Sequence, residues 1–111
     1  DNSELFEAIS WEVIRKVHDF EPQNLAITAW AYAAVNQPKE KLFEAIATES
    51  IKKMDRFDPQ CCANLMHAFG KLQVKHEALV ESLCSRVTAS VERFKTLELC
   101  NVAWGIAKMS L

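Results

Sequence analysis

The chain has 111 residues, half of them apolar, and a formal net charge of −2 at pH 7. No stretch approaches the ~18 uninterrupted apolar residues of a membrane span, and two glycines and three prolines are too few for the many turns of a β-sandwich. The weakly acidic balance argues against strong non-specific phosphate binding by this chain alone, because such affinity grows with the number of Lys and Arg contacts.

Similar residues recur at a fixed spacing of 37 positions along the chain. The spacing is followed by three phenylalanines and by two aliphatic columns: Phe20, Phe57 and Phe94; Leu5, Leu42 and Leu79; Ile9, Ile46 and Leu83. A fixed period of about 20–50 residues is typical of stacked repeat units. Such arrays work through an extended surface rather than one catalytic pocket.

Each period contains two predicted helices. In chain order the helices cover about residues 3–19, 22–35, 39–55, 59–72, 76–92 and 96–109. We call 22–35, 59–72 and 96–109 the A-type helices and the other three the B-type helices. The first two A-type helices begin with Glu21-Pro22 and Asp58-Pro59, which suit the N-cap and the first helical position, and Thr96 can cap the third.

These elements predict an all-α chain. Connections of about three residues make neighbouring helices antiparallel. The expected fold is an α-solenoid of antiparallel helical hairpins with a 37-residue repeat and about six helices. Residues 1–111 form a single helical-repeat domain in this interpretation. We expect it to be a fragment of a longer array, because the open end of a solenoid exposes apolar surface unless another unit covers it.

Repeated apolar columns at helical spacing predict the core. The columns comprise Leu25, Ala29, Trp30, Tyr32 and Ala33 with their counterparts at +37 and +74, and Leu42, Phe43, Ile46, Ile51 and Met54 with Leu79, Val80, Leu83 and Val91. Trp30, His67 and Trp104 share one column, so we expect these rings to be packed. The periodic phenylalanines are expected to fill the corners between B-type and A-type helices.

A second set of positions on the A-type helices is polar or small and differs between the copies. This A-helix stripe consists of Asn24, Ile27, Ala31 and Ala34; Cys61, Asn64, Ala68 and Lys71; and Glu98, Asn101, Gly105 and Lys108. The spacing i, i+3, i+7, i+10 places each set along one helix face. Asn can pair with base edges and Lys with phosphates. The stripe is therefore either a recognition surface, for RNA or for another protein, or an ordinary solvated face.

No catalytic or metal-binding pattern is present in the sequence. The four cysteines lack metal-ligand spacing and are expected to be reduced packing residues: Cys61, Cys62, Cys84 and Cys100. The three histidines share no acid and nucleophile pattern, and no glycine-rich phosphate loop occurs. We expect no enzymatic activity, no cofactor and no metal. A modest basic patch on the B-type helices is interpreted as solvated charge: Arg15, Lys16, Lys52, Lys53 and Arg56.

Three stretches resemble a known repeat family. The segment beginning Phe20-Glu21-Pro22-Gln23 and continuing through Trp30, the related Phe57-Asp58-Pro59-Gln60, and the half-motif around Asn101 and Trp104 are similar to the A-helix signature of octotricopeptide and heptatricopeptide repeat proteins. The 37-residue period resembles the heptatricopeptide variety, whereas tetratricopeptide repeats have a different period and consensus.

That resemblance implies RNA work in an organelle. It implies a non-catalytic factor of transcript stabilisation, processing or translation that binds single-stranded organellar RNA, with a chloroplast location preferred over a mitochondrial one and no membrane span. The contact residues implied by the resemblance are Asn24, Ile27, Cys61, Asn64, Glu98 and Asn101, and Lys71 and Lys108 of the same A-helix stripe complete the predicted contact set. The alternative is a structural, protein-binding subunit of a large organellar complex such as a ribosome or a photosynthetic assembly.

Overall fold

The computed structural model describes residues 2–110, with the side chains of residues 2–109. This part of the chain contains six α-helices and three short 3-10 helices and no strand, which confirms an all-α chain with six helices. In chain order the elements are α1 (Ser3–Lys16), η1 (Val17–Asp19), α2 (Pro22–Ala34), α3 (Glu40–Lys52), η2 (Met54–Arg56), α4 (Pro59–Leu72), α5 (Glu77–Ala89), η3 (Val91–Arg93) and α6 (Thr96–Ser110).

The starts of the helices follow local capping chemistry. The carboxylate of Asp58 accepts a hydrogen bond from the Cys61 N–H at 2.8 Å, and Pro59 occupies the first helical position, where no N–H is needed. Glu21 and Asn24 form a reciprocal capping box at the start of α2. At α5 the ring of His76 takes the same role, accepting from the Leu79 N–H at 3.1 Å.

Each B-type helix ends differently from the sequence expectation. Instead of continuing as one α-helix to about residues 19, 55 and 92, it stops earlier and closes in a 3-10 turn. The periodic phenylalanine follows that turn in extended conformation, and its N–H bonds back to the first residue of the turn, as in Phe57 N to Met54 O at 3.1 Å. The tighter turn satisfies backbone groups that an α-helix end leaves unpaired.

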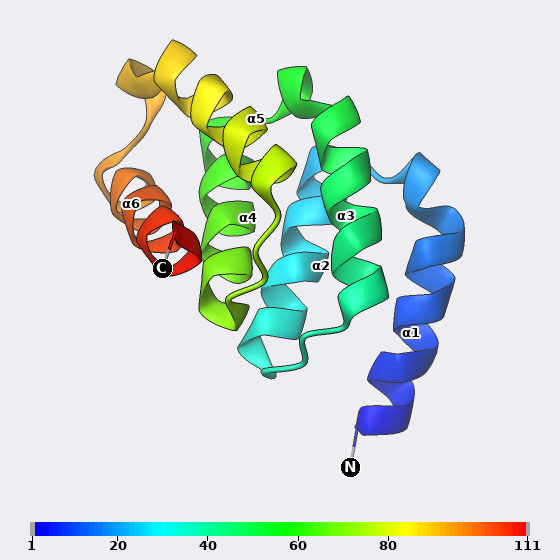
Figure 1. Ribbon diagram of the computed structural model, residues 1–111. Coiled ribbons are helices and arrows are strands. Elements are labelled where there is room, and N and C mark those ends of the chain that lie inside the picture. Colours follow the sequence, from blue (N-terminus) through cyan, green and yellow to red (C-terminus); the bar gives the residue numbers. More distant parts are fainter. Residues whose placement is uncertain (1, 111) are drawn as a thin grey trace.

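The six helices lie in two layers, α1–α3–α5 and α2–α4–α6, joined by antiparallel hairpins (Figure 1). Within the second layer the helices approach closely, because small residues face one another. A Cβ atom added to Gly70 would lie 2.7 Å from the Gly105 Cα, and one added to Gly105 would lie 2.5 Å from the Met66 carbonyl oxygen. Only glycine fits at these two positions without a shift of the backbone.

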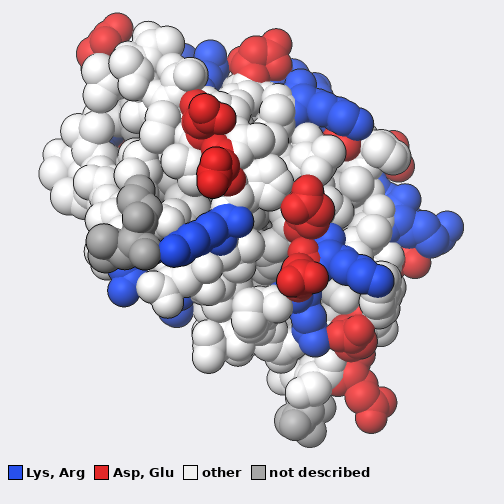
Figure 2. Space-filling view, in the orientation of Figure 1, with Lys and Arg blue, Asp and Glu red and all other residues white. Residues whose placement is uncertain are grey.

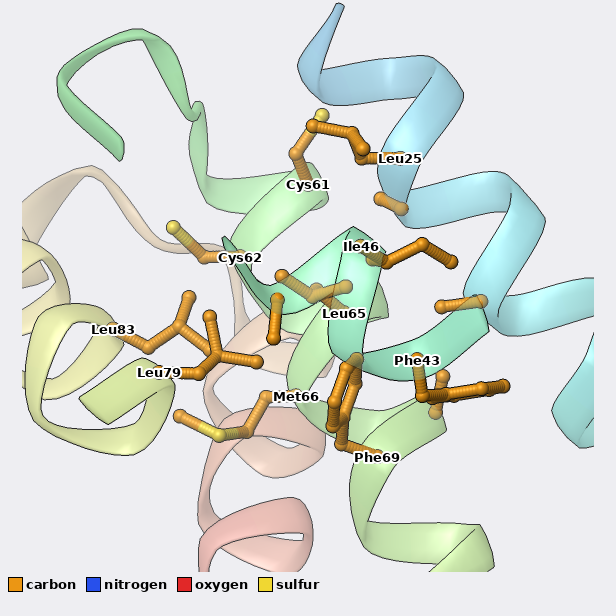
Figure 3. Close-up of a cluster of buried hydrophobic side chains, with 14 of the residues drawn as sticks. Leu25, Phe43, Ile46, Cys61, Cys62, Leu65, Met66, Phe69, Leu79 and Leu83 are labelled. Carbon is orange, nitrogen blue, oxygen red and sulfur yellow. The ribbon is translucent and has the colours of Figure 1, made fainter. Parts of the chain in front are cut away.

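The core fills the space between the layers (Figure 3). Phe43 of α3 meets Phe69 of α4 edge to face with ring centroids 4.9 Å apart. Leu79 and Leu83 of α5 point toward Met66 from the other side (Figure 3). All five side chains are fully buried.

Several predicted core residues are not buried. Phe57 and Phe94 are buried corner residues, but Phe20 is half-buried. On α6, Leu99 is 41 % exposed, and Ala103 and Ala107 are also exposed. Their counterparts in α2 and α4 are buried because another helix covers them, whereas no further helix of the described chain covers α6.

Candidate functional site

The helix-start members of the A-helix stripe are occupied by capping. The side chain of Asn24 accepts from the Glu21 N–H at 2.9 Å, and that of Glu98 accepts from the Lys95 N–H at 2.8 Å. Cys61 stands at the equivalent position of α4 and is 5 % exposed. Burial, with a smaller contribution from its hydrogen bond to Asp58, raises the pKa of the Cys61 thiol to about 12. This thiol is neither accessible nor ionised.

The mid-helix small residues of the stripe face the neighbouring helix. Ala68 is fully buried, Gly105 packs against Met66, and Ala31 is half-buried. They provide the close approach of α2, α4 and α6 described above, and they do not line a ligand surface.

The residues that face outward on the α2–α4–α6 layer are not those of the A-helix stripe, because the outward-facing set begins one residue earlier in each helix. It follows i, i+4, i+7, i+11, and every member is exposed or half-buried. We call this surface the ladder face; it consists of Gln23, Ile27, Trp30 and Ala34 of α2, Gln60, Asn64, His67 and Lys71 of α4, and Leu97, Asn101, Trp104 and Lys108 of α6. Ile27, Asn64, Lys71, Asn101 and Lys108 from the predicted contact set lie on it.

A row of aromatic rings crosses the middle of the ladder face. Trp30 is 49 % exposed and Trp104 is 41 % exposed, so the expectation that these rings are packed in the core is wrong. His67 lies between them in the row and stacks on Trp104, with centroids 4.6 Å apart and an interplanar angle of 25°. Trp30, Ala33, Ala34, His67 and Lys71 line a shallow groove of about 80 Å³ between α2 and α4.

Two lysines flank this row. The Nζ of Lys108 lies 5.8 Å from the centroid of the Trp104 ring, and Lys71 is exposed beside His67. Burial, and secondarily the charge of Lys71, lowers the pKa of His67 below its usual value of 6.5. The imidazole is therefore neutral near pH 7, and the charges of the ladder face are the two ammonium groups.

Asn64 and Asn101 provide free amide groups next to the aromatic row. Both are half-buried, and within residues 2–110 neither side-chain amide has a hydrogen-bond partner. The ladder face thus combines flat rings, free amides and cations. That combination can stack on bases, pair with their edges and approach phosphates.

The opposite face carries a different pattern of charge. Over α1, α3 and α5, acidic and basic side chains are interspersed without a field of one sign (Figure 2). Four members of the predicted basic patch pair with carboxylates: Arg15 and Lys16 with Glu12, Lys53 with Glu49, and Arg56 with Glu21. This face is neutralised internally.

A buried ion pair at the end of α3 also contacts η1. Glu49 is 4 % exposed, and its carboxylate lies 3.1 Å from Lys53 Nζ and 3.2 Å from the ring of His18. Lys53 also donates to the carbonyl oxygens of His18 at 2.9 Å and Phe20 at 2.5 Å. Burial raises the pKa of Glu49, but the bonds to Lys53 and His18 outweigh it, so the net pKa is lowered. The cluster fixes the α1–α2 corner against α3.

Within the described residues no group of three or more His, Cys, Asp or Glu side chains is arranged to hold a metal ion. In the same part of the chain no helix has the length and apolar character that crossing a bilayer requires.

The sequence model of one protein family, RNA-editing substrate-binding complex 6 protein (RESC6), matches residues 1–111. The chain belongs to the RESC6 family. No curated protein matches the chain. The match replaces the assignment to octotricopeptide and heptatricopeptide repeats, which is wrong. The motifs behind that assignment were a proline at the helix start and small or aromatic residues at helical spacing, which many packed helical hairpins share.

The sequence contained one signal for the aromatic row. Tryptophan is amphipathic, and two tryptophans and a histidine at one repeat position already suggested a common role. Their position one residue after the predicted core column Ala29, Met66 and Ala103 made them look like part of the core.

Proposed function

We propose that this chain is a non-catalytic subunit of an RNA-editing substrate-binding complex and contacts single-stranded RNA through the ladder face. The proposed contact residues are Trp30, His67 and Trp104, together with Ile27, Asn64, Lys71, Asn101 and Lys108. The proposed contact residues do not include Asn24, Glu98 and Cys61 of the predicted contact set, because the first two cap helices and the third is buried.

The aromatic row is the observation that carries this proposal. Two exposed tryptophans with a stacked histidine between them offer flat surfaces to successive bases, and stacking contributes about 1–3 kcal/mol per base. Stacking is tolerant of sequence, whereas the amides of Asn64 and Asn101 add hydrogen bonds to base edges.

The charge of the chain sets the expected strength of binding. Only Lys71 and Lys108 are cationic on the ladder face, and the chain as a whole has a net charge of −2. Two phosphate contacts predict a salt dependence with a slope of about −1.4 in log K against log salt. Such weak electrostatics suit a subunit that holds RNA together with neighbouring subunits.

The arrangement of the helices supports a repeat interpretation. The α-helices of each layer begin 37 residues apart, at Ser3, Glu40 and Glu77 and at Pro22, Pro59 and Thr96. We propose that residues 1–111 form stacked helical hairpins of a repeat domain.

Membership in an RNA-editing complex also favours an organellar, mitochondrial location over a chloroplast location.

A protein-binding scaffold is the second candidate. It is favoured by large apolar side chains exposed outside the ladder face, including Leu5 at 57 % and Val91 at 46 %. A subunit of this kind contacts other members of the complex and leaves RNA to them.

Anisotropy titration with a labelled single-stranded oligouridine, from about 50 to 200 mM salt, distinguishes the two. We expect retained RNA at low salt, a shallow slope near −1.4, and a slope reduced by about 0.7 in Lys71→Ala and in Lys108→Ala. The matched control is Lys41→Ala, since Lys41 lies 5.5 Å from the Trp11 ring on the opposite face. Absence of binding at low salt would refute the RNA proposal and favour the scaffold.

A further inference from the structure

The rings of the aromatic row are unevenly spaced. His67 and Trp104 stack with their centroids 4.6 Å apart. A base between two rings needs about 7 Å from face to face, because stacked carbon atoms lie about 3.5 Å apart. No base therefore enters between His67 and Trp104, and these two rings present one joint surface.

The other gap in the aromatic row is open. Trp30 and His67 both line the groove of about 80 Å³ between α2 and α4. Ala33 and Ala34 also line it, and their small side chains leave room beside the two rings. A flat ring that enters this groove contacts Trp30 and His67 together.

The size of the groove favours a single ring. Its volume is smaller than the roughly 150 Å³ of an apolar cavity that takes one benzene molecule. A six-membered pyrimidine ring can enter through the open side of the groove, whereas the fused double ring of a purine needs more room in the same plane. The small volume therefore selects for pyrimidine bases.

Lys71 supplies the polar contact. It is exposed, and it lines the groove together with His67. Uracil and cytosine both carry a carbonyl oxygen at C2, which an ammonium group can bind, and the phosphate of the same nucleotide is a second acceptor. His67 adds no charge of its own near pH 7, because burial and the charge of Lys71 lower its pKa.

We infer that the groove between α2 and α4 is a base slot that holds a single pyrimidine base of a bound RNA strand, with Trp30 and His67 against the base and Lys71 bound to the same nucleotide. This inference rests on the proposed RNA-binding role of the ladder face. The corresponding seam between α4 and α6 is already filled by the stack of His67 on Trp104. Over the described residues the ladder face therefore has one base slot, and not one for each pair of neighbouring helices.

Anisotropy titrations with labelled oligouridine, oligocytidine and oligoadenosine of equal length test the base slot. At about 50 mM salt we expect the two pyrimidine strands to bind about 5-fold or more tightly than oligoadenosine, the equivalent of one base stack. Ala34→Leu fills the groove and leaves both rings and Lys71 in place, so it should abolish this preference. Ala78→Leu, the same change at an exposed position of α5, is the matched control and should keep the preference.

Crosslinking gives a second measurement that needs no variant. An oligoadenosine strand with one central 4-thiouridine should place that base in the slot and crosslink to Trp30 or His67 on irradiation. Equal affinities for the three strands, a pyrimidine preference that survives in Ala34→Leu, or crosslinks confined to residues outside the groove would overturn the base slot while RNA binding stands. Absence of binding to all three strands would instead refute the proposed function itself, and the base slot with it.

Discussion

The two layers are held together by different kinds of contact. In the α2–α4–α6 layer, alanines and glycines let the helices approach until backbone meets backbone, as at Gly70 and Gly105. In the α1–α3–α5 layer, larger side chains turn toward the core and charged groups tie neighbouring elements together. Lys53, which pairs with Glu49 at the end of α3, donates to the carbonyl oxygens of His18 and Phe20. Close helices bring residues of equal height together across the surface, which places the His67 and Trp104 rings 4.6 Å apart. Tight packing of one layer thus creates the ladder face, whereas the other layer has a surface of neutralised charge.

The largest effect is expected from crowding the close layer. Gly105→Val places a branched side chain where even a Cβ lies 2.5 Å from the Met66 carbonyl, and it should lower the free energy of unfolding by about 3 kcal/mol. Ala103→Val, on the exposed side of the same helix, should cost about 0.5 kcal/mol. Urea unfolding followed by circular dichroism measures both. Equal costs would mean that the layer is not closely packed.

The ion pair of the other layer gives a smaller, pH-dependent effect. Glu49→Gln keeps the shape of the side chain but removes its charge, and it should cost about 1–3 kcal/mol at pH 7. Since the folded-state pKa of Glu49 is lowered, its contribution is present above the unfolded value near 4.5 and is lost as the pH falls through the folded pKa. Denaturation at pH 7 and at successively lower pH should therefore show the wild type and the variant converging. A constant difference would contradict the lowered pKa.

The smallest effect concerns a single proton on the ladder face. Lys71→Ala removes the secondary cause of the lowered His67 pKa and should raise that pKa while burial still holds it below 6.5. Titration of the imidazole by NMR measures the change. Lys75→Ala, on the α4–α5 connection, is the control and should leave the His67 pKa unchanged. An unchanged His67 pKa in Lys71→Ala would show that the charge of Lys71 does not act on the aromatic row.

Periodicity and capping chemistry determined much of the fold in advance. The acid–proline pairs mark the starts of α2 and α4, because few residues suit the N-cap and first helical position equally well. The 3-10 turns before Phe20, Phe57 and Phe94 could not be predicted, because they depend on how each corner packs. The exposure of Leu5, Ile9 and Leu99 could not be predicted either. A column of similar residues that recurs in all three repeats does not show which of its members another helix covers.

The exposed face of the α2–α4–α6 layer begins one residue earlier in each helix than the predicted A-helix stripe. Ala31, Ala68 and Gly105 looked like surface positions because they are small, yet small residues are what close helix contacts require. Trp30 and Trp104 looked like core because they are large and apolar. In this layer, neighbouring helices and the α1–α3–α5 layer cover most of each helix, so only a narrow strip of residues stays exposed. Amino-acid composition alone does not determine which residues form that strip.

The affinity for RNA of two tryptophan variants tests the central claim most directly. Trp30→Ala and Trp104→Ala should each weaken binding of single-stranded oligouridine by about 5- to 150-fold, the equivalent of one lost base stack, with unchanged far-UV circular dichroism. Trp11→Ala removes a tryptophan of equal exposure that also lies under a lysine, but on the opposite face, and should bind as the wild type does. Equal losses in all three variants, or none in Trp30→Ala and Trp104→Ala, would contradict the ladder face as the RNA-binding surface.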